Sequence, residues 1–315
     1  MPIPRCVAAA AAFGPVIYVL GGSGKANGEP DTNSRINQIF DPATGNWTFG
    51  PPMQTRRCLF PAVTRPGFLF AVGGYNETGP IASVEFYNPN TKVWSQFPLM
   101  NWPRAGAAAA VVGNRLYVFG GNSGNAIVAD VTPLGPSSEF NLTAEYFDFN
   151  TNQWVMLPNE LPMGFYGPAT AVIGNKVYMY GGLTRDPDYN FSSIAFDTVT
   201  QRFEYILSPG FDRVWCAGGA VGGKAYAFGG IRYKRLQPTG SITEYAPEAN
   251  AWSRVPQYST PPRAMMACAV YEVVQPPGQV VFLFGGSTVF TNAPVYGTVE
   301  QFMPSDSTFY LLKKT

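Results

Sequence analysis

The chemistry open to this 315-residue chain is limited first by a missing residue type, because it contains no histidine. Histidine is the commonest general base and the usual partner of a nucleophilic Ser or Cys, so the Ser-His-Asp and Cys-His systems are excluded. Zinc sites built on imidazole are excluded for the same reason. The sequence therefore predicts no catalytic residues, no metal and no cofactor.

Two short stretches offer weaker chemical signals. The segment "GGSGKANG", Gly21–Gly28, is similar to a phosphate-binding loop, but Ala26 follows Lys25 where Ser or Thr is required. The segment "RDPDY", Arg185–Tyr189, carries two carboxylates, which are usually solvated in a surface loop. Neither pattern predicts an active site.

The elements that would have to position any site repeat along the chain. Six Gly pairs recur at intervals of 47 to 61 residues, each with an aromatic residue three positions before its first Gly. The pairs begin at Gly21, Gly73, Gly120, Gly181, Gly229 and Gly285. A period of this length indicates a repeat architecture.

A second landmark divides each repeat into strands. In every repeat one position, usually Asp or Asn, stands six residues before an aromatic, as in Asp148 and Trp154. Runs of four to seven residues rich in aromatic and β-branched side chains lie between turn sequences. Each repeat is therefore predicted to form four strands, a to d, with small residues on the crowded inner strand a and the Trp on strand d. Six four-stranded units around an axis would make a β-propeller.

These landmarks resemble the kelch repeat over essentially the whole chain. The resemblance implies an all-β fold, a six-bladed kelch-type propeller with four antiparallel strands per blade and a single domain, 1–315. The expected blades are 2–51, 52–99, 100–157, 158–208, 209–256 and 257–315. The last strand, Phe309–Leu312, should form the outer edge of blade 6, which should pack directly on blade 1 without exchange of a strand.

An Arg near the start of strand a varies together with a Glu on strand c, which predicts a structural ion pair within each repeat. The expected pairs are Arg57–Glu85, Arg104–Glu145, Arg213–Glu244 and Arg263–Glu300. Repeat 4 lacks both members and has Phe165 and Ile194, while repeat 1 keeps Arg5 and has the neutral acceptor Gln38.

Composition limits the partners and the compartment. The net charge is +1 and charged residues make up 13% of the chain, so we expect no nucleic-acid partner and no attraction to an anionic membrane. The apolar N-terminal run resembles a signal peptide or a membrane span, but its internal echo at 102–121 favours strands a and b, without membrane insertion. The four cysteines, Cys6, Cys58, Cys216 and Cys268, are expected to be free buried thiols.

Four Asn-x-Ser/Thr sequons point towards the outside of the cell. They lie at Asn46, Asn76, Asn141 and Asn190, all in predicted exposed turns or loops where a glycan could be attached. The sequence therefore leans towards a secreted or surface protein, with a cytoplasmic protein as the alternative.

Function is expected to lie in the loops. In kelch propellers the b–c and d–a loops emerge on one face, which usually captures partners, so the resemblance implies a non-catalytic module that binds a protein or a glycan. Tyr, Trp and Arg are enriched in binding hot spots. The binding candidates are Trp102, Arg185, Tyr189, Phe211, Trp215, Arg232, Tyr233, Lys234, Arg235 and Tyr258.

Two other functions remain open from the sequence. A structural subunit of an extracellular assembly fits the sequons and the low charge. Separately, the blade 1 loop carries Glu29 and Asp31, so the binding face is polarised and the acidic side of one molecule could meet the basic side of another. A kelch-type sugar isomerase similar to the mutarotases would need Arg and acidic groups at the channel mouth. That mouth is expected to be apolar, with Cys6, Cys58, Ala105, Val214 and Ala264.

Overall fold

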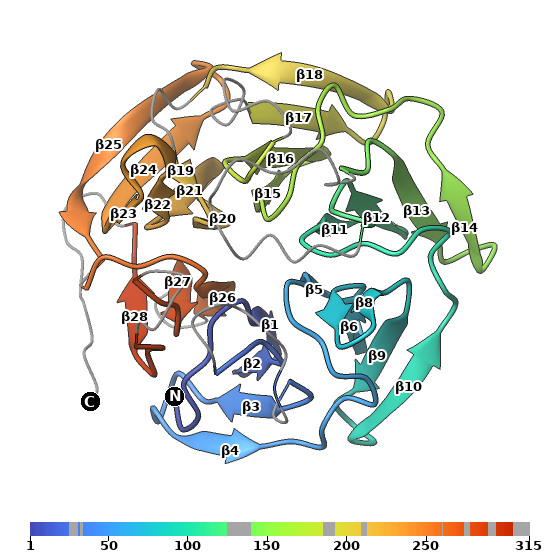
Figure 1. Ribbon diagram of the computed structural model, residues 1–315, viewed down its shortest axis with the longest axis horizontal. Coiled ribbons are helices and arrows are strands. Elements are labelled where there is room, and N and C mark those ends of the chain that lie inside the picture. Colours follow the sequence, from blue (N-terminus) through green and yellow to red (C-terminus); the bar gives the residue numbers. More distant parts are fainter. Residues whose placement is uncertain are drawn as a thin grey trace.

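The chain folds as six antiparallel sheets arranged as blades around a central axis (Figure 1). The computed structural model describes residues 1–24, 31, 34–124, 140–184, 193–208, 213–259, 261–273, 278–288 and 294–304. Within these residues the predicted all-β propeller is confirmed, and the short 3-10 helix η2 (Tyr233–Arg235) belongs to a loop.

Each blade is built from strands that follow one another in sequence, with strand a nearest the axis. Blades 1 and 2 comprise β1 (Ala9–Phe13), β2 (Val16–Leu20), β3 (Asn37–Phe40) and β4 (Trp47–Phe49), then β5 (Ala62–Arg65), β6 (Phe68–Val72), β9 (Val84–Asn88) and β10 (Val93–Phe97). Blades 3 and 4 comprise β11 (Ala108–Val112), β12 (Arg115–Phe119), β13 (Ala144–Asp148) and β14 (Gln153–Met156), then β15 (Ala169–Ile173), β16 (Lys176–Tyr180), β17 (Ser193–Asp197) and β18 (Arg202–Ile206).

The last two blades follow the same order. Blade 5 comprises β20 (Ala217–Val221), β21 (Lys224–Phe228), β24 (Ser241–Ala246) and β25 (Ala251–Tyr258). Blade 6 comprises β26 (Ala267–Val273), β27 (Gly278–Phe284) and β28 (Val299–Phe302). The strand expected at Phe309–Leu312 lies outside the described residues.

Two small sheets decorate the b–c loops. One pairs β7 (Tyr75–Asn76) with β8 (Gly79–Pro80) in blade 2. The other has the order β19-β22-β23 in blade 5, from β19 (Arg213–Val214), β22 (Ile231–Arg232) and β23 (Gln237–Pro238).

The spaces between blades are filled by the aromatic landmarks. Between blades 1 and 2, Tyr18 packs edge-on against Tyr87, with ring centroids 5.6 Å apart, in a cluster that includes Trp94. The strand d Trp also ties blades together at the rim, because the Nε1 of Trp94 donates to the carbonyl of Pro51 at 3.0 Å and that of Trp154 to Pro98 at 2.9 Å. Each such bond links one blade to the end of the preceding blade's strand d.

The Gly pair marks the seam where the backbone of the next blade crosses. The amide of Gly22 donates to the carbonyl of Arg57 at 3.0 Å, and a Cβ on Gly21, whose φ is +54°, would lie 2.4 Å from that same carbonyl oxygen. A side chain would clash there, so the Gly pair is required by close approach as well as by a left-handed φ.

Ring closure uses the same seam. Gly286 donates to the carbonyl of Arg5 at 2.9 Å, and β1 packs beside β26. In the described residues β1 pairs only with β2, so blade 6 packs directly on blade 1, as the sequence predicts.

Three of the four predicted ion pairs are confirmed, and all three are buried. Arg57 and Glu85 are 2.7 Å apart, Arg104 and Glu145 are 3.1 Å apart, and Arg263 and Glu300 are 3.0 Å apart. The carboxylates also accept hydrogen bonds from the d–a loop: Glu85 from the amides of Gln54 and Thr55, Glu145 from the amide of Asn101, and Glu300 from the hydroxyl of Ser259. Each pair therefore fixes the d–a loop onto strand c of the same blade.

Blade 4 makes the same junction without charge. Phe165 and Ile194 replace the pair and are buried together in one apolar cluster. In blade 1 the expected acceptor Gln38 is not the partner of Arg5. Gln38 bonds instead to both backbone groups of Ile3, while Arg5 pairs with Asp31 at 2.8 Å.

We expect Arg104→Ala to lower the free energy of unfolding by about 3 kcal/mol, because it leaves the buried Glu145 carboxylate without its guanidinium. The double variant Arg104→Phe/Glu145→Ile copies blade 4 and should be milder. Urea unfolding of both variants measures the difference. A double variant no more stable than the single one would contradict the pair.

The seam gives a second prediction with an internal control. A Cβ on Gly285 would lie 2.0 Å from the carbonyl oxygen of Arg5, whereas a Cβ on Gly14 would meet nothing within 4 Å, although both residues have a left-handed φ. Gly14→Ala should cost about 1 kcal/mol from backbone strain alone. Gly285→Ala should cost on the order of 3 kcal/mol or more. Equal losses in chemical denaturation would show that close approach does not matter at the closing seam.

Candidate functional site

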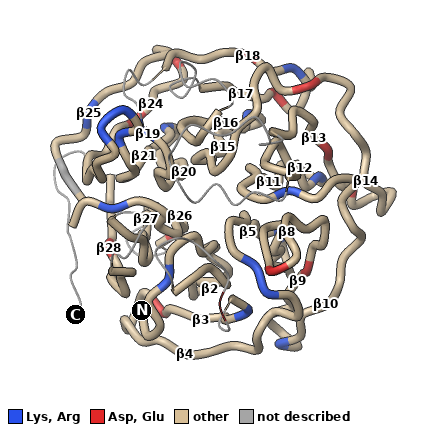
Figure 2. The backbone as a smooth tube through the Cα atoms, in the orientation of Figure 1, with Lys and Arg blue, Asp and Glu red and all other residues tan. Residues whose placement is uncertain are grey.

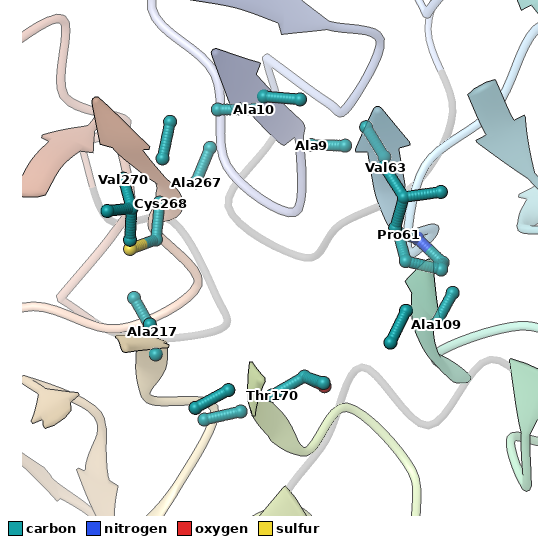
Figure 3. Close-up of a pocket in the computed structure, with 18 of the residues that line it drawn as sticks. Ala9, Ala10, Pro61, Val63, Ala109, Thr170, Ala217, Ala267, Cys268 and Val270 are labelled. Atoms are coloured by element: carbon teal, nitrogen blue, oxygen red, sulfur yellow. The ribbon is translucent and has the colours of Figure 1, made fainter. Parts of the chain in front are cut away.

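A cavity of about 540 Å³ lies on the axis of the propeller, enclosed by the six inner strands (Figure 3). Its wall is made largely of Ala side chains, among them Ala9, Ala109, Ala217 and Ala267 (Figure 3). Small residues are needed where the inner strands converge, since a Cβ on Gly218 would lie 2.6 Å from both the Cβ of Ala169 and the hydroxyl of Tyr180. The sequence-based explanation of the Ala-rich strand a therefore fits the packing.

An apolar plug fills the axis at the end where strand a begins. Its buried members are Cys6, Val7, Cys58, Leu59, Ala105, Tyr166, Leu183, Val214, Trp215, Ile231, Ala264 and Met265. This end carries the b–c and d–a loops. The mouth is thus apolar, as expected from the residues that follow the landmark Arg.

The plug is held by backbone hydrogen bonds that run around the axis. Leu59 donates to Val7, Val7 donates to Met265, and Met265 donates to Trp215, each at 3.0 Å. These four residues have φ between 48° and 58°. A left-handed φ is costly for branched and aromatic residues. The surrounding packing must therefore over-determine this conformation, which makes the plug a fixed floor.

The cavity wall offers little chemistry. Besides the Ala side chains it presents Thr64, Thr170, Glu272 and Gln279 as polar groups, so the lining contains one carboxylate and no Lys or Arg. In the part of the chain that the structure describes, no group of three acidic or Cys side chains is placed to hold a metal ion. The arrangement lacks the converging Arg and acidic groups that a sugar isomerase would need.

Trp215, predicted to be an exposed binding residue, is buried in the plug with 5% of its surface accessible. Its ring packs edge-on against Tyr166, with centroids 5.0 Å apart, and covers Gly167, where a Cβ would lie 2.5 Å from the indole. The prediction was wrong because the left-handed φ of Trp215 turns its side chain over the neighbouring blade.

The predicted cationic run is displayed on an ordered hairpin over blade 5. Arg213 pairs with Arg232, and β22 pairs with β23 around η2. Lys234 and Arg235 are exposed, Arg232 is half-buried, and Tyr233 packs partly against the plug. Figure 2 shows the Lys and Arg residues of this loop above blade 5, near β24 and β25. The run is therefore a projecting surface with an anchored base.

The other predicted binding residues lie in different environments. Trp102 is 50% exposed in the d–a loop that leads into blade 3, where Leu99 is 64% exposed. Tyr258 is the last residue of β25, past the expected blade boundary at 256, and belongs to a strand instead of the d–a loop. Arg185, Tyr189 and Phe211 lie outside the described residues.

The fourth predicted ion pair, Arg213–Glu244, is wrong. Glu244 instead pairs with Lys224 at 2.9 Å and accepts from the hydroxyls of Tyr226 and Ser253. Arg213 donates to the Oγ of Ser241 at 2.8 Å. The reason is register, because side chains alternate between the faces of a strand and a shift of one residue reverses the face.

The residue at the register position of the missing carboxylate is Thr243. It stands opposite Ala227, as Glu85 stands opposite Ala71. A sequence signal for this existed, since Glu85, Glu145 and Glu300 each precede the strand c–d landmark by three positions, and three positions before Ala246 is Thr243. The sequence prediction assigned the partner of Arg213 to Glu244, which lies one residue past this register position.

Burial lowers the pKa of Arg213 to about 10, and the nearby charges of Arg232 and Arg254 act in the same direction. Arg254 lies directly across from Thr243 on β25 and is exposed. Sequence reasoning missed Ser241, Thr243 and Arg254 as parts of this cationic region.

The sequons are not equivalent. Asn46 is exposed and Asn76 is half-buried, but Asn141 is 8% exposed, and its Oδ1 accepts from the amide and hydroxyl of Thr143. The expectation of exposure is wrong for Asn141 because the residue turns inward to begin strand c. Asn190 lies outside the described residues.

The four cysteines are free thiols, as predicted. Cys6, Cys58 and Cys216 are buried, whereas Cys268 is half-buried and lines the axial cavity (Figure 3). Burial raises the pKa of Cys216, and it raises that of Cys268 to about 12. Cys216 and Cys268 are therefore not reactive thiolates. Cys6 and Cys58 are buried as small residues of the apolar plug.

Comparisons with known proteins agree with this architecture. The Kelch motif family model matches residues 4–54, 56–101 and 103–131. Kelch-like protein 23 of Homo sapiens is 28% identical over 262 residues, which cover 83% of this chain and 43% of that protein. Kelch-like protein 38 of Rattus norvegicus is 26% identical over 75% of this chain and 38% of its own length, and Kelch-like protein 25 of Xenopus tropicalis is 26% identical over 85% and 44%.

The chain thus spans less than half of the length of these curated relatives. The matched region begins at blade 1, and the Gly pairs recur in all six blades, while the buried Arg recurs in every blade except blade 4. With six sequential repeats closed into one propeller, the chain is similar to kelch-repeat proteins in both sequence and architecture.

Proposed function

We propose that this propeller is a protein-binding module whose partner contacts the b–c/d–a face over blade 5. The observation that carries the proposal is the hairpin of β22, η2 and β23, which holds Lys234, Arg235 and Leu236 outwards. Leu236 has a left-handed φ of 50° and is 53% exposed. Cations flanking an exposed apolar side chain suit a protein surface of complementary charge.

The hairpin is pre-ordered, which favours binding. Its base is paired to β19, and Tyr233 packs against the plug, so a partner would not have to order this part of the loop. Association costs less free energy when the binding segment already has its bound conformation. The d–a loop with Leu99 and Trp102 supplies a further exposed apolar surface on the same side of blade 3.

A protein fits this surface better than a glycan does. Sugar recognition commonly uses an exposed aromatic platform beside its polar groups, and here Trp215 is buried while Tyr233 is half-buried. The four exposed or half-buried cations at Arg232, Lys234, Arg235 and Arg254 favour a partner rich in Asp and Glu.

The competing functions receive less support. A sugar isomerase is disfavoured because the axial cavity is lined mostly by Ala and Gly and is closed at one end by an apolar plug. Self-association through an acidic blade 1 loop is disfavoured because the Asp31 carboxylate forms an ion pair with Arg5 of the same molecule, with N and O atoms 2.8 Å apart. The buried Asn141 weakens the case for an extracellular assembly. Among the described residues, no helix has the length and hydropathy to cross a membrane.

Replacement of Lys234 and Arg235 by Ser should reduce recovery of a specific protein partner about tenfold in affinity capture from native extract, because two exposed cations are removed while the hairpin pairing remains. The loss should be largest at low salt, where the charges are least screened. Quantitative mass spectrometry of the captured proteins provides the measurement.

The matched control removes two exposed cations from the opposite face, with Lys92→Asn and Arg202→Ser near the c–d turns. This control should capture the partner like the wild type. Equal recovery by the hairpin variant and the wild type would remove the blade 5 face from consideration.

A further inference from the structure

The axial cavity has one end that the apolar plug does not fill. Its lining runs from Gly167 and Trp215 beside the plug to Val172 and Glu272 near the ends of β15 and β26. Trp215 is 5% exposed, whereas Val172 is 38% exposed and Glu272 is exposed. The cavity is therefore a well of about 540 Å³, with the plug as its floor and its opening on the side of the a–b turns. Binding pockets for small molecules commonly have volumes of this order.

The wall of the well is apolar up to a carboxylate at the opening. Cys268, Val270 and Glu272 alternate along β26, so they share one face of that strand. All three line the cavity, and Figure 3 shows Cys268 and Val270 at its wall. Thr170 and Val172 line it in the same way from β15 of blade 4. The stripe on β26 therefore leads from the depth of the well to an acidic group at its edge.

The hairpin of blade 6 carries this carboxylate on an extension. β26 and β27 pair over seven residues, whereas the a–b strands of the other blades pair over four or five. Glu272 lies directly across from Gln279, and the Oε1 of Gln279 accepts from the amide of Gly222 in the blade 5 turn at 3.2 Å. The extension is thus anchored to the neighbouring blade, which fixes Glu272 beside the opening.

Cations on the same side of the molecule are held away from the axis. Three of them begin strand b of their blades, and each forms an ion pair with a carboxylate on strand c or d of the same blade. These pairs are Arg115–Asp148, Lys176–Glu204 and Lys224–Glu244. A fourth cation, Arg65, lies 3.7 Å from the ring centroid of Phe149 in blade 3. Within the described residues Glu272 forms no ion pair, and the lining of the well holds no Lys or Arg.

We propose that this well binds a small organic amine, with its apolar part against the Ala and Val side chains and its ammonium group at the Glu272 carboxylate. An amine is favoured over a neutral or anionic molecule because the opening supplies a carboxylate and no competing cation. The well opens at the end of the axis opposite the b–c/d–a face. The site therefore goes beyond the proposed protein binding and is independent of it.

The probe is octylamine, compared with 1-octanol and octanoate, which keep the alkyl chain and change the charge. At pH 7 the amine is protonated and glutamate is ionised. Isothermal titration calorimetry should show saturable binding of octylamine about tenfold tighter than that of octanol. Octanoate should bind more weakly than octanol, because its carboxylate would meet that of Glu272.

Two variants separate the apolar wall from the charge. Thr170→Phe fills the well from blade 4 and should weaken both octylamine and octanol at least tenfold, with Val199→Phe at a residue 71% exposed as its matched control. Glu272→Gln should remove the preference for octylamine over octanol, with the exposed Glu248→Gln as its control. Both controls should bind octylamine as the wild type does.

Cys268 reports occupancy of the well without any change to its wall. The other three cysteines are buried, so N-ethylmaleimide should label Cys268 first, and saturating octylamine should slow that labelling at least threefold. Mass spectrometry of the labelled chain measures the rate, which keeps the test informative if Thr170→Phe fails to fold.

Equal affinities of the wild type for octylamine and octanol would overturn the proposal, as would unchanged octylamine affinity in Thr170→Phe. Labelling of Cys268 at the same rate with and without octylamine would also overturn it. The hairpin variant Lys234→Ser/Arg235→Ser should bind octylamine as the wild type does, so failure of the amine site and failure of the protein-binding face are distinguishable.

Discussion

The structure depends on the seam between blades, where the backbone of one blade meets the Gly pair of the one before it. At five of the six seams the second Gly donates to a main-chain carbonyl of the next blade. At every first Gly except Gly120, a Cβ would lie within 3.0 Å of a neighbouring atom. The Arg that contributes this carbonyl also binds the loop carbonyls of its own blade, as Arg104 binds Gly120 and Thr143. One Arg thus serves two blades at four of these seams, and in blade 4 Phe165 supplies the carbonyl without a guanidinium.

The seam also explains why the centre of the molecule is inert. Because the Arg side chains are drawn away from the axis into their own blades, the residues that follow them are left to form an apolar plug. The inner strands then converge so closely that mostly Ala and Gly fit along the cavity wall. The polar groups that could recognise a partner therefore lie in the loops, among them the cationic hairpin of blade 5, whose base is paired to β19.

Variation among the buried junctions separates architecture from function. Blades 2, 3 and 6 use Arg and Glu, blade 1 recruits Asp31 from a loop, and blade 4 dispenses with charge. All of these solutions hold the d–a side of the blade. Blade 5 differs because Thr243 replaces the carboxylate while additional Arg residues gather around it, and this departure coincides with the loop that we propose binds the partner.

The sequence by itself determined the repeat, the number of blades and the placement of most strands, because these follow from local turn chemistry and from residues that recur at a fixed spacing. It also determined the three buried Arg–Glu pairs, since the two positions vary together. Only the tertiary structure decided that Glu244 faces away from Arg213, that Asp31 reaches Arg5 and that Trp215 is buried. The physical reason is that each outcome depends on strand register or on a neighbouring blade. A shift of one residue moves a side chain to the other face of its strand. Trp215 is buried because its indole packs over Gly167 of the neighbouring blade, where no side chain stands in the way.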